Sequence, residues 1–274
     1  MRDNAYIEEN ESLKIVKFSI FDKYRDDIIA GFSTRDGGVS KGIYESMNLG
    51  FEIGDNQQNV LENYKIFSRY LDINYKNIVI SSQYHHNNIK IVKEKDKGKG
   101  IFRNKDYQDI DGFITNTPEI ALVTLHADCS PIYFYDPKNK VIGLAHAGWK
   151  GTTMEISSEM VEKMSLEFNT NPEDLVAVIG PSICDRCYEI DENVKNEFDN
   201  MSIDTSSYIS FDNKKNKYYP DIPMINKALL INKGVKEENI KLSNICTMEN
   251  KDLFFSHRGH KGKRGSQAAI LQLK

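Results

Sequence analysis

A cysteine and several histidines follow apolar, strand-like runs between residues 78 and 146. Cys129 comes shortly after the run Ile120–Leu125, His146 directly follows Val141–Ala145, and His85 ends a third such run. One thiolate with two imidazoles is a ligand set for zinc, and three protein ligands leave a fourth position for water, as in catalytic sites. The three residues are far apart in the sequence, so the pattern also fits a buried cysteine beside two hydrogen-bonded histidines.

Three further side chains near this set could take part in proton transfer. His86 adjoins one predicted ligand and His126 lies close to another, and an imidazole titrates near neutral pH. Asp128 directly precedes the cysteine, where its carboxylate could orient a ligand histidine or simply cap a turn. We therefore count His86, His126 and Asp128 as candidate catalytic residues.

The segment after the third strand predicts a helix start that suits an anion. Thr152 and Glu155 have the spacing of a capping box, which places the helix N-terminus beside them. The unpaired N–H groups of a first helical turn attract negative charge, Gly148 and Gly151 allow close approach, and Lys150 adds a cation. A plain strand–helix connection is the alternative.

The other three cysteines carry a weaker signal. Cys184-x-x-Cys187 resembles half of a zinc ribbon or a redox pair, but the sequence contains no second C-x-x-C and no thioredoxin-like βαβ pattern around it. We therefore interpret the pair as ordinary cysteines near the pocket and Cys246 as a core residue.

The pattern of strand-like and helical runs around these residues predicts a mixed α/β (α+β) sandwich with flanking helices. Strand-like runs outnumber helical ones, and Ile78–Ser81 and Ile89–Val92 have a hairpin-like pattern. Regular βαβ alternation is lacking over residues 14–146, which disfavours a doubly wound sheet. Without internal repeats or a Pro/Ser-rich linker, we expect a single domain over residues 1–274, with 1–12 frayed and the charged run 93–100 a solvated loop.

Composition excludes several classes of protein. The formal net charge of −4 gives no overall basic field for nucleic acid or anionic lipid. No apolar run is long enough to cross a bilayer, and the charged N-terminal segment is unlike a signal peptide. We expect a cytoplasmic protein whose partners are neither nucleic acid nor membrane, with its 4 cysteines as thiols or metal ligands.

Several motifs occur together in the order found in one known family. They are ADC followed by AHAGWKGT, GFSTRDGGVS with NLG, QYH, IGPSIC with CYEI, and the tail FFSHRG with GSQAA. On these motifs the chain resembles the YfiH/YlmD family, once called polyphenol oxidases or laccase-domain proteins and now regarded as purine nucleoside phosphorylases. The resemblance covers most of the chain and points to the same mixed α/β sandwich.

The resemblance implies a site and an activity. The family's zinc ligands correspond to His85, Cys129 and His146, so one Zn²⁺ per chain is expected. Its pocket motifs include Arg35 and Asn48; with Lys150 and Arg258 these are the expected contacts for phosphate or ribose. The implied activity is phosphorolysis of adenosine, inosine and S-methyl-5'-thioadenosine, with adenosine deaminase activity. The implied partners are therefore purine nucleosides and phosphate.

This sequence departs from the family pattern at four positions. His86 replaces a glycine, His126 a threonine, Lys150 an arginine and His257 a tyrosine. Two additional imidazoles therefore lie near the expected metal, where each could be a fourth ligand, a general acid or base, or a substrate contact.

Three other functions remain as alternatives. A copper polyphenol oxidoreductase with a full multicopper centre needs more than the 6 histidines present, although a Cys–His₂ set could bind one copper. A metal-free cysteine hydrolase would use Cys129 as nucleophile and His146 as base. A non-enzymatic binding protein leaves the group of histidines without a use.

Overall fold

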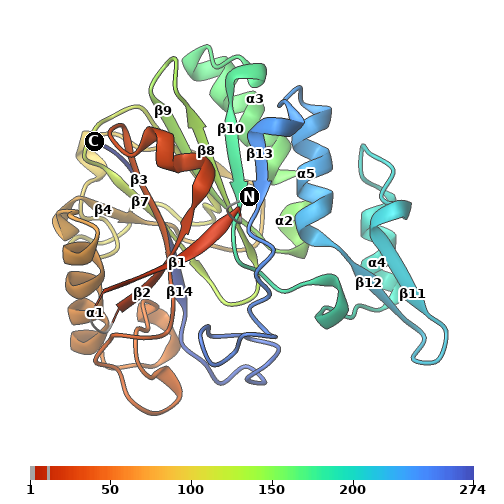
Figure 1. The fold of residues 1–274 in the computed structure, drawn as a ribbon, viewed down its shortest axis with the longest axis horizontal. Helices are drawn as coiled ribbons and strands as arrows, with labels where there is room; N and C mark the ends of the chain where they lie inside the picture. Colours follow the sequence, from red (N-terminus) through yellow and green to blue (C-terminus); the bar gives the residue numbers. More distant parts are fainter. Residues whose placement is uncertain (1–3, 11–12) are drawn as a thin grey trace.

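Two six-stranded β-sheets pack face to face in the computed structural model, which describes residues 4–10 and 13–274 (Figure 1). The first sheet has the order β1-β2-β3-β14-β7-β4. Its strands are β1 (Ala5–Asn10), β2 (Leu13–Phe18), β3 (Ile28–Ser33), β4 (Ile78–Ile80), β7 (Ala121–His126) and β14 (Gln267–Leu273). The second sheet has the order β13-β10-β8-β9-β6-β5. Its strands are β5 (Ile89–Ile91), β6 (Gly112–Thr115), β8 (Ser130–Asp136), β9 (Val141–Ala147), β10 (Val176–Ile179) and β13 (Ile240–Leu242).

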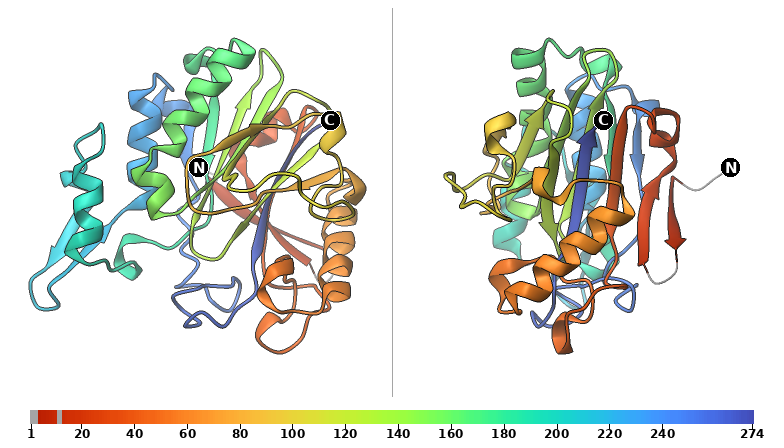
Figure 2. Two further views of the ribbon diagram at one scale, coloured as in Figure 1. Left: turned by 180° about the vertical axis from the view of Figure 1, so that it is seen from behind. Right: turned by 90° about the vertical axis from the view of Figure 1, so that its left-hand side faces the viewer.

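Helices cover the outer faces of both sheets, and a small hairpin lies beside them (Figures 1 and 2). The helices are α1 (Gln57–Tyr70), α2 (Trp149–Thr153), α3 (Ile156–Phe168), α4 (Glu192–Asp199) and α5 (Ile222–Asn232). Helix α1 packs on the first sheet, whereas α3 and α5 pack on the second. The hairpin of β11 (Ile209–Asp212) and β12 (Lys217–Pro220) projects with α4 at one side. The expected mixed α/β sandwich is confirmed.

The alternation of side chains along each strand produces these layers. In β7, Leu122 enters the core between the two sheets and Val123 enters the core beneath α1. In β8, Tyr133 lies between the sheets and Phe134 faces α3. The central strands β7, β8 and β9 are buried on both faces because both sides of their sheets are covered, and this accounts for their continuous apolar runs in the sequence.

Two connections cross from the first sheet to the second, and both carry candidate ligands. His85 lies on the connection from β4 to β5, and Cys129 lies on the short connection from β7 to β8. The hairpin-like pattern at 78–92 was therefore misread, since β4 and β5 lie in different sheets. His146 lies within β9 of the second sheet, which pairs with β8 in register Pro131↔His146.

Three local expectations were wrong. Ala5–Asn10 forms β1, antiparallel to β2, rather than a frayed end; positions 1–3 and 11–12 lie outside the described residues. In the run 93–100, Asp96 and Lys99 are buried and ion-paired, so it is not a solvated loop. No capping box forms at Thr152, which is buried inside the helical segment. Glu155 instead breaks the helix with φ 57°, and α3 begins after it.

Candidate metal centre and its cavity

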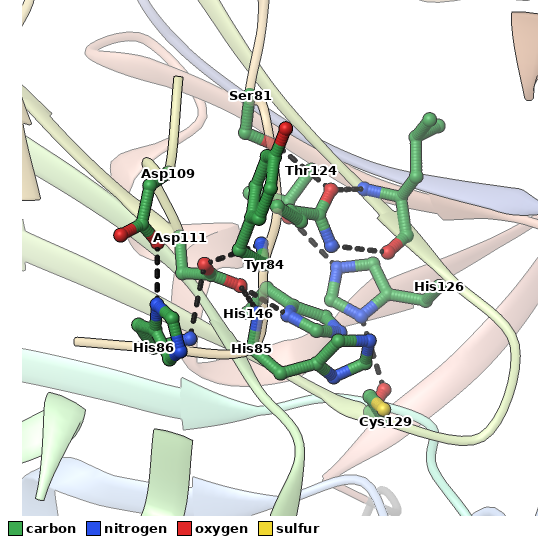
Figure 3. A network of polar contacts seen from close by, with 12 residues as sticks. Ser81, Tyr84, His85, His86, Asp109, Asp111, Thr124, His126, Cys129 and His146 are labelled. Carbon is green, nitrogen blue, oxygen red and sulfur yellow. Dashed lines mark hydrogen bonds and ion pairs between the residues drawn. The ribbon is translucent and has the colours of Figure 1, made fainter. Parts of the chain in front are cut away.

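His85, Cys129 and His146 converge at one point where the two sheets meet (Figure 3). Their ligand atoms all lie within 4.8 Å of one another. His146 is held rigidly by its strand, whereas His85 occupies a left-handed backbone conformation with φ 63°. Gly148 completes the packing, because a Cβ there would come 2.8 Å from His85 Nδ1 and 3.1 Å from Cys129 Sγ. The structure thus brings together all three predicted ligands.

Asp111 organises two of these residues. Its buried carboxylate accepts a hydrogen bond from His146 Nδ1 at 2.8 Å, so the Nε2 atom remains for a metal. The same carboxylate accepts the backbone N–H groups of Tyr84, His85 and His86 and so holds the left-handed turn in place. A carboxylate behind a ligand histidine sets its tautomer and strengthens it as a donor. The sequence analysis missed Asp111, although it directly precedes a strand.

The charges at the centre favour a thiolate. Burial alone would raise the pKa of Cys129, but the neighbouring imidazoles, chiefly that of His146, lower it to about 6. Burial alone would lower the pKa of His146, but the Cys129 thiolate and the hydrogen bond to Asp111 raise it to about 9. These shifts favour a thiolate at Cys129, the form that binds zinc, whereas His146 would have to release its Nε2 proton to bind a metal.

His126 is committed to the backbone next to the cysteine. Its Nδ1 donates to the carbonyl of Cys129 at 3.0 Å, so its Nε2 is left to accept from the Thr124 hydroxyl at 2.7 Å. Burial, followed by the positive charge of His146, lowers the pKa of His126 well below its usual range. The neutral ring therefore stabilises the loop that carries Cys129. Both of its nitrogens are engaged, so neither is left for a metal or a substrate.

His86 points away from the three ligands (Figure 3). Its Nδ1 lies 2.8 Å from Asp109 Oδ1, and its side chain is 40% exposed. It does not line the cavity described below.

Asp128 caps a turn rather than orienting a histidine. Its backbone is left-handed with φ 89°, and its carboxylate accepts from the Thr247 hydroxyl and from the backbone N–H of Arg258, both at 2.7 Å. Its carbonyl accepts the N–H of Ile183 at 2.9 Å. Asp128 therefore joins the Cys129 loop to two distant loops.

A cavity of about 900 Å³ opens over the three ligands. Its walls combine apolar and aromatic side chains with a few cations, the composition usual for small-molecule sites. Residues that line it include Phe51, Gln83, Lys105, Tyr107, Leu125, Ile183, Tyr188, His257, Arg258 and Arg264. The volume suits an organic molecule of moderate size together with a small anion.

Arg264 is a half-buried cation in the wall of this cavity. One guanidinium nitrogen, Nη1, donates to the Gly265 carbonyl and the Ser266 hydroxyl, whereas the buried Nε has no hydrogen-bond partner among the described residues. Burial lowers the pKa of Arg264, and the negative charges of Cys129 and Asp128 partly oppose this. The sequence analysis missed Arg264 because it stands in a glycine-rich basic loop without a motif of its own.

The expected anion contacts are divided between the cavity and the scaffold. Arg258 lines the cavity and stacks over Tyr188. Lys150 is exposed beside a smaller adjoining pocket of about 290 Å³. Arg35 instead donates to the Glu45 carbonyl through Nε and Nη2 and stacks on Phe255, outside the cavity lining.

Asn48 also belongs to the scaffold. It is fully buried, and its amide binds Gly50 and Asp55 and accepts the N–H of Ser266. It therefore shapes the wall in which Gly50 and Ser266 line the cavity, rather than reaching the cavity itself.

The expected anion site after Gly151 does not have the predicted form. Gly151 lies inside α2, which begins at Trp149 after Gly148 and has only five residues. A helix this short has a weak dipole and offers little attraction to an anion at its N-terminus.

The fold and this ligand set define a class of protein. The chain belongs to the family described as multi-copper polyphenol oxidoreductase laccase, whose profile matches residues 29–274.

The curated relatives carry a different description. The chain is 34% identical over 252 residues to purine nucleoside phosphorylase YlmD of Bacillus subtilis, covering 90% of this chain and 89% of the relative. It is 37% identical to a purine nucleoside phosphorylase of Staphylococcus epidermidis, covering 93% of this chain and 94% of the relative.

Solved structures agree with the fold throughout the chain. A Bacillus licheniformis hypothetical protein YfiH superposes with a TM-score of 0.92 at 32% identity, covering 98% of this chain and 99% of the other. YlmD of Geobacillus stearothermophilus superposes with a TM-score of 0.90 at 29% identity, covering 99% of each chain. No helix in the described part of the chain is long and apolar enough to cross a membrane.

Proposed function

We propose that the protein is a zinc-dependent purine nucleoside phosphorylase. The observation that carries the proposal is the convergence of His85, Cys129 and His146, with Asp111 behind them, at the base of a cavity that also presents Arg264. The names of the relatives supply the reaction class. The resemblance supplies the finer substrates: adenosine, inosine and S-methyl-5'-thioadenosine, with adenosine deaminase as a second activity.

The ligand set fits zinc better than a multicopper centre. One thiolate and two imidazoles form a compact site for a single ion, which His146 approaches through Nε2 because its Nδ1 is bound to Asp111. A blue site with a trinuclear cluster needs many more imidazoles close together than the described residues provide. A zinc ion held there would polarise a substrate oxygen or activate a water molecule.

The chain's own residues account for the rest of phosphorolysis. Arg264 and Arg258 line the cavity and can bind phosphate and stabilise the negative charge that moves during transfer. Tyr188 and Phe51 provide aromatic surfaces suited to a purine ring. His257 also lines the cavity and can protonate the leaving base, a role that the arrangement of His86 and His126 does not favour.

A metal-free cysteine hydrolase is the second candidate. Cys129, His146 and Asp111 form a nucleophile, base and orienting carboxylate, and the lowered pKa of Cys129 suits a nucleophile.

The decisive experiment is inosine phosphorolysis, followed by the formation of hypoxanthine and ribose 1-phosphate. We expect turnover that requires phosphate, disappears on zinc removal, returns on zinc addition, and is lost in Cys129→Ala. A chelated protein that remains fully active and is inactivated by thiol alkylation would favour the hydrolase. Oxidation of phenols only after loading with copper, without phosphorolysis, would favour the oxidoreductase.

A further inference from the structure

A second group of metal-binding side chains lies on two loops beside the cavity. Cys184 and Cys187 follow β10, and Cys246 and Glu249 follow β13. Each pair has the same x-x spacing, so the sequence presents C-D-R-C and C-T-M-E as two halves of one set. Because Glu249 stands where a second C-x-x-C would have its last cysteine, the sequence pattern alone does not reveal the match.

The two halves meet because their strands are parallel neighbours. β10 pairs with β13 in register Ile179↔Leu242, and the ladder resumes beyond the strands at the parallel bridge Ser182↔Cys246. The carboxyl ends of parallel strands lie at the same edge of a sheet, so the loops that follow run side by side. Thr247 N–H donates to the Ser182 carbonyl at 3.0 Å and joins the two loops.

The four ligand atoms already have nearly the spacing of a tetrahedral site. They all lie within 4.8 Å of one another. Glu249 Oε1 is 3.7 Å from Cys184 Sγ and 3.9 Å from Cys187 Sγ, and the backbone N–H of Cys184 donates to Cys246 Sγ at 3.4 Å. Tetrahedral zinc with its usual bond lengths separates such ligands by roughly 3.5–3.8 Å. A small contraction would complete the site.

The chemistry of the set selects the metal. Three thiolates and one carboxylate close all four tetrahedral positions, and thiolates favour zinc over hard cations. N–H···S hydrogen bonds such as that from Cys184 stabilise the negative sulfur of a ligand. Binding releases the thiol protons and needs no oxidant or reductant.

We propose that Cys184, Cys187, Cys246 and Glu249 form a second, structural zinc site. Its carboxylate ligand is shared with Arg186, whose guanidinium binds both Glu249 oxygens at 3.0 and 3.1 Å. That ion pair orients the exposed carboxylate toward the sulfur atoms.

The site has a direct connection to the cavity. Ile183 and Tyr188, which flank the C-x-x-C turn, both line the cavity wall. Thr247, inside the other half, donates its hydroxyl to Asp128, which adjoins Cys129. A metal that joins the two loops would therefore fix one wall of the cavity and support the turn that presents the first metal's cysteine.

The test is metal content in cysteine variants of the full chain purified under reducing conditions. The chain has 4 cysteines, so in Cys129→Ala every remaining cysteine belongs to the second set. We expect about two zinc per chain in the wild type, about one in Cys129→Ala and in Cys246→Ser, and none in the double variant. The single variants test the two sites separately. Zinc lost only in Cys129→Ala belongs to the proposed catalytic site, and zinc lost only in Cys246→Ser belongs to the second site.

Cobalt(II) gives an independent readout in the Cys129→Ala protein. Three thiolates should produce an intense thiolate-to-cobalt charge-transfer band and protect all three thiols from a thiol reagent until a chelator is added. Glu249→Gln should weaken binding, whereas Glu238→Gln, a glutamate outside the set, should not. If Cys246→Ser, which alters a buried residue, fails to fold, Cys184→Ser at a half-buried position replaces it.

Two results would overturn the proposal. One is a reduced Cys129→Ala protein that binds no zinc and whose thiols react equally with and without added metal. The other is a Cys184–Cys187 disulfide that persists under the same reducing conditions, which would make the pair a redox element.

Discussion

At the scale of single residues, the orientation of the candidate ligand His146 depends on one buried carboxylate. Asp111 binds His146 Nδ1 and three backbone N–H groups at once, so both of its oxygens are engaged as acceptors. An amide in its place can accept on one side only, and its NH₂ group would face backbone donors.

Asp111→Asn should therefore weaken zinc binding by roughly 10- to 100-fold, the usual effect of losing a partner behind a metal ligand. Competition with a chromophoric chelator measures it. Asp109→Asn is the matched control, because Asp109 binds His86 and Asn88 and not a ligand side chain. Equal losses in both variants would mean that Asp111 acts only on the loop's stability.

Arg264 permits a second test at this scale. Its half-buried guanidinium is a positive charge in the cavity wall, so its replacement should affect the proposed phosphate more than the nucleoside. We expect Arg264→Lys to raise the KM for phosphate by about 10-fold or more, as for the loss of about 1.4 kcal/mol of binding, with a smaller change in the KM for inosine.

The control for Arg264 is Arg35→Lys, which changes a cation outside the cavity lining. The opposite result, a KM for phosphate that is unchanged in Arg264→Lys but raised in Arg35→Lys, would contradict this prediction. It would place the phosphate at Arg35, one of the contacts expected from the sequence.

At the scale of elements, the loop after β5 is stabilised by a buried ion pair. Lys99 and Asp96 are 3% and 0% exposed and lie 2.6 Å apart, and Lys99 also reaches Asp106 at the surface. The backbone of this loop bonds β4 through Ile80 N–H to the Lys99 carbonyl. The next residue, Gly100, lines the cavity, so the ion pair supports a cavity wall.

Asp96→Asn should lower the free energy of unfolding by about 2–3 kcal/mol, less than for a wholly unpaired buried charge because Asp106 remains. Asp106→Asn, at the exposed end, should cost distinctly less, because solvent screens an exposed ion pair. Urea unfolding compares the two. Similar losses in both variants would show that burial of Asp96 adds nothing.

The same ion pair predicts how stability changes with pH. Burial alone would raise the pKa of Asp96, but the bond from Lys99 leaves it lowered. Its contribution is therefore present above the unfolded value of about 3.9 and is lost as the pH falls through the lower folded value. Burial alone would lower the pKa of Lys99, but its two carboxylates leave it raised. Its contribution is present below about 10.4 and is lost as the pH rises through the folded value.

Urea unfolding of Asp96→Asn at several pH values checks this dependence. The difference in the free energy of unfolding between wild type and Asp96→Asn should shrink as the pH falls below about 3.9, the unfolded pKa of an aspartate. A difference that stays constant down to the acid transition would contradict the assignment.

At the scale of the whole molecule, the candidate metal centre joins the two sheets. His85 and Cys129 lie on the two connections that cross from the first sheet to the second, and His146 lies within the second sheet. A metal bound there stabilises only the folded arrangement, because the unfolded chain holds these residues far apart.

Removing the metal should therefore lower the free energy of unfolding, by about 4 kcal/mol when free zinc is 1,000-fold above its dissociation constant. Thermal unfolding with and without chelator measures the loss. Cys129→Ala should remove the first site's share of it, and any loss that remains belongs to the second cysteine set. A melting temperature unaffected by chelator in a protein that contains zinc would contradict the assigned position.

Much of the fold could be predicted from local pattern. The sequence shows apolar runs at β3, β7, β8 and β9 and a periodic apolar pattern at α1. These patterns arise because a strand buried on both faces is apolar throughout, whereas a helix buried on one face is apolar at helical spacing. His85, Cys129 and His146 stand at or near strand ends, so their residue types and positions could be recognised before their geometry was known.

Only the tertiary structure decided which side chains meet. Asp111 reaches His146 because β6 and β9 are paired, and Glu249 reaches Cys184 because β10 and β13 are parallel neighbours. His86 and His126 are near the ligands in sequence, yet one turns toward Asp109 and the other toward the Cys129 carbonyl. Local pattern records whether a residue is buried, but contacts between distant residues depend on strand order and register, which no short stretch of sequence contains.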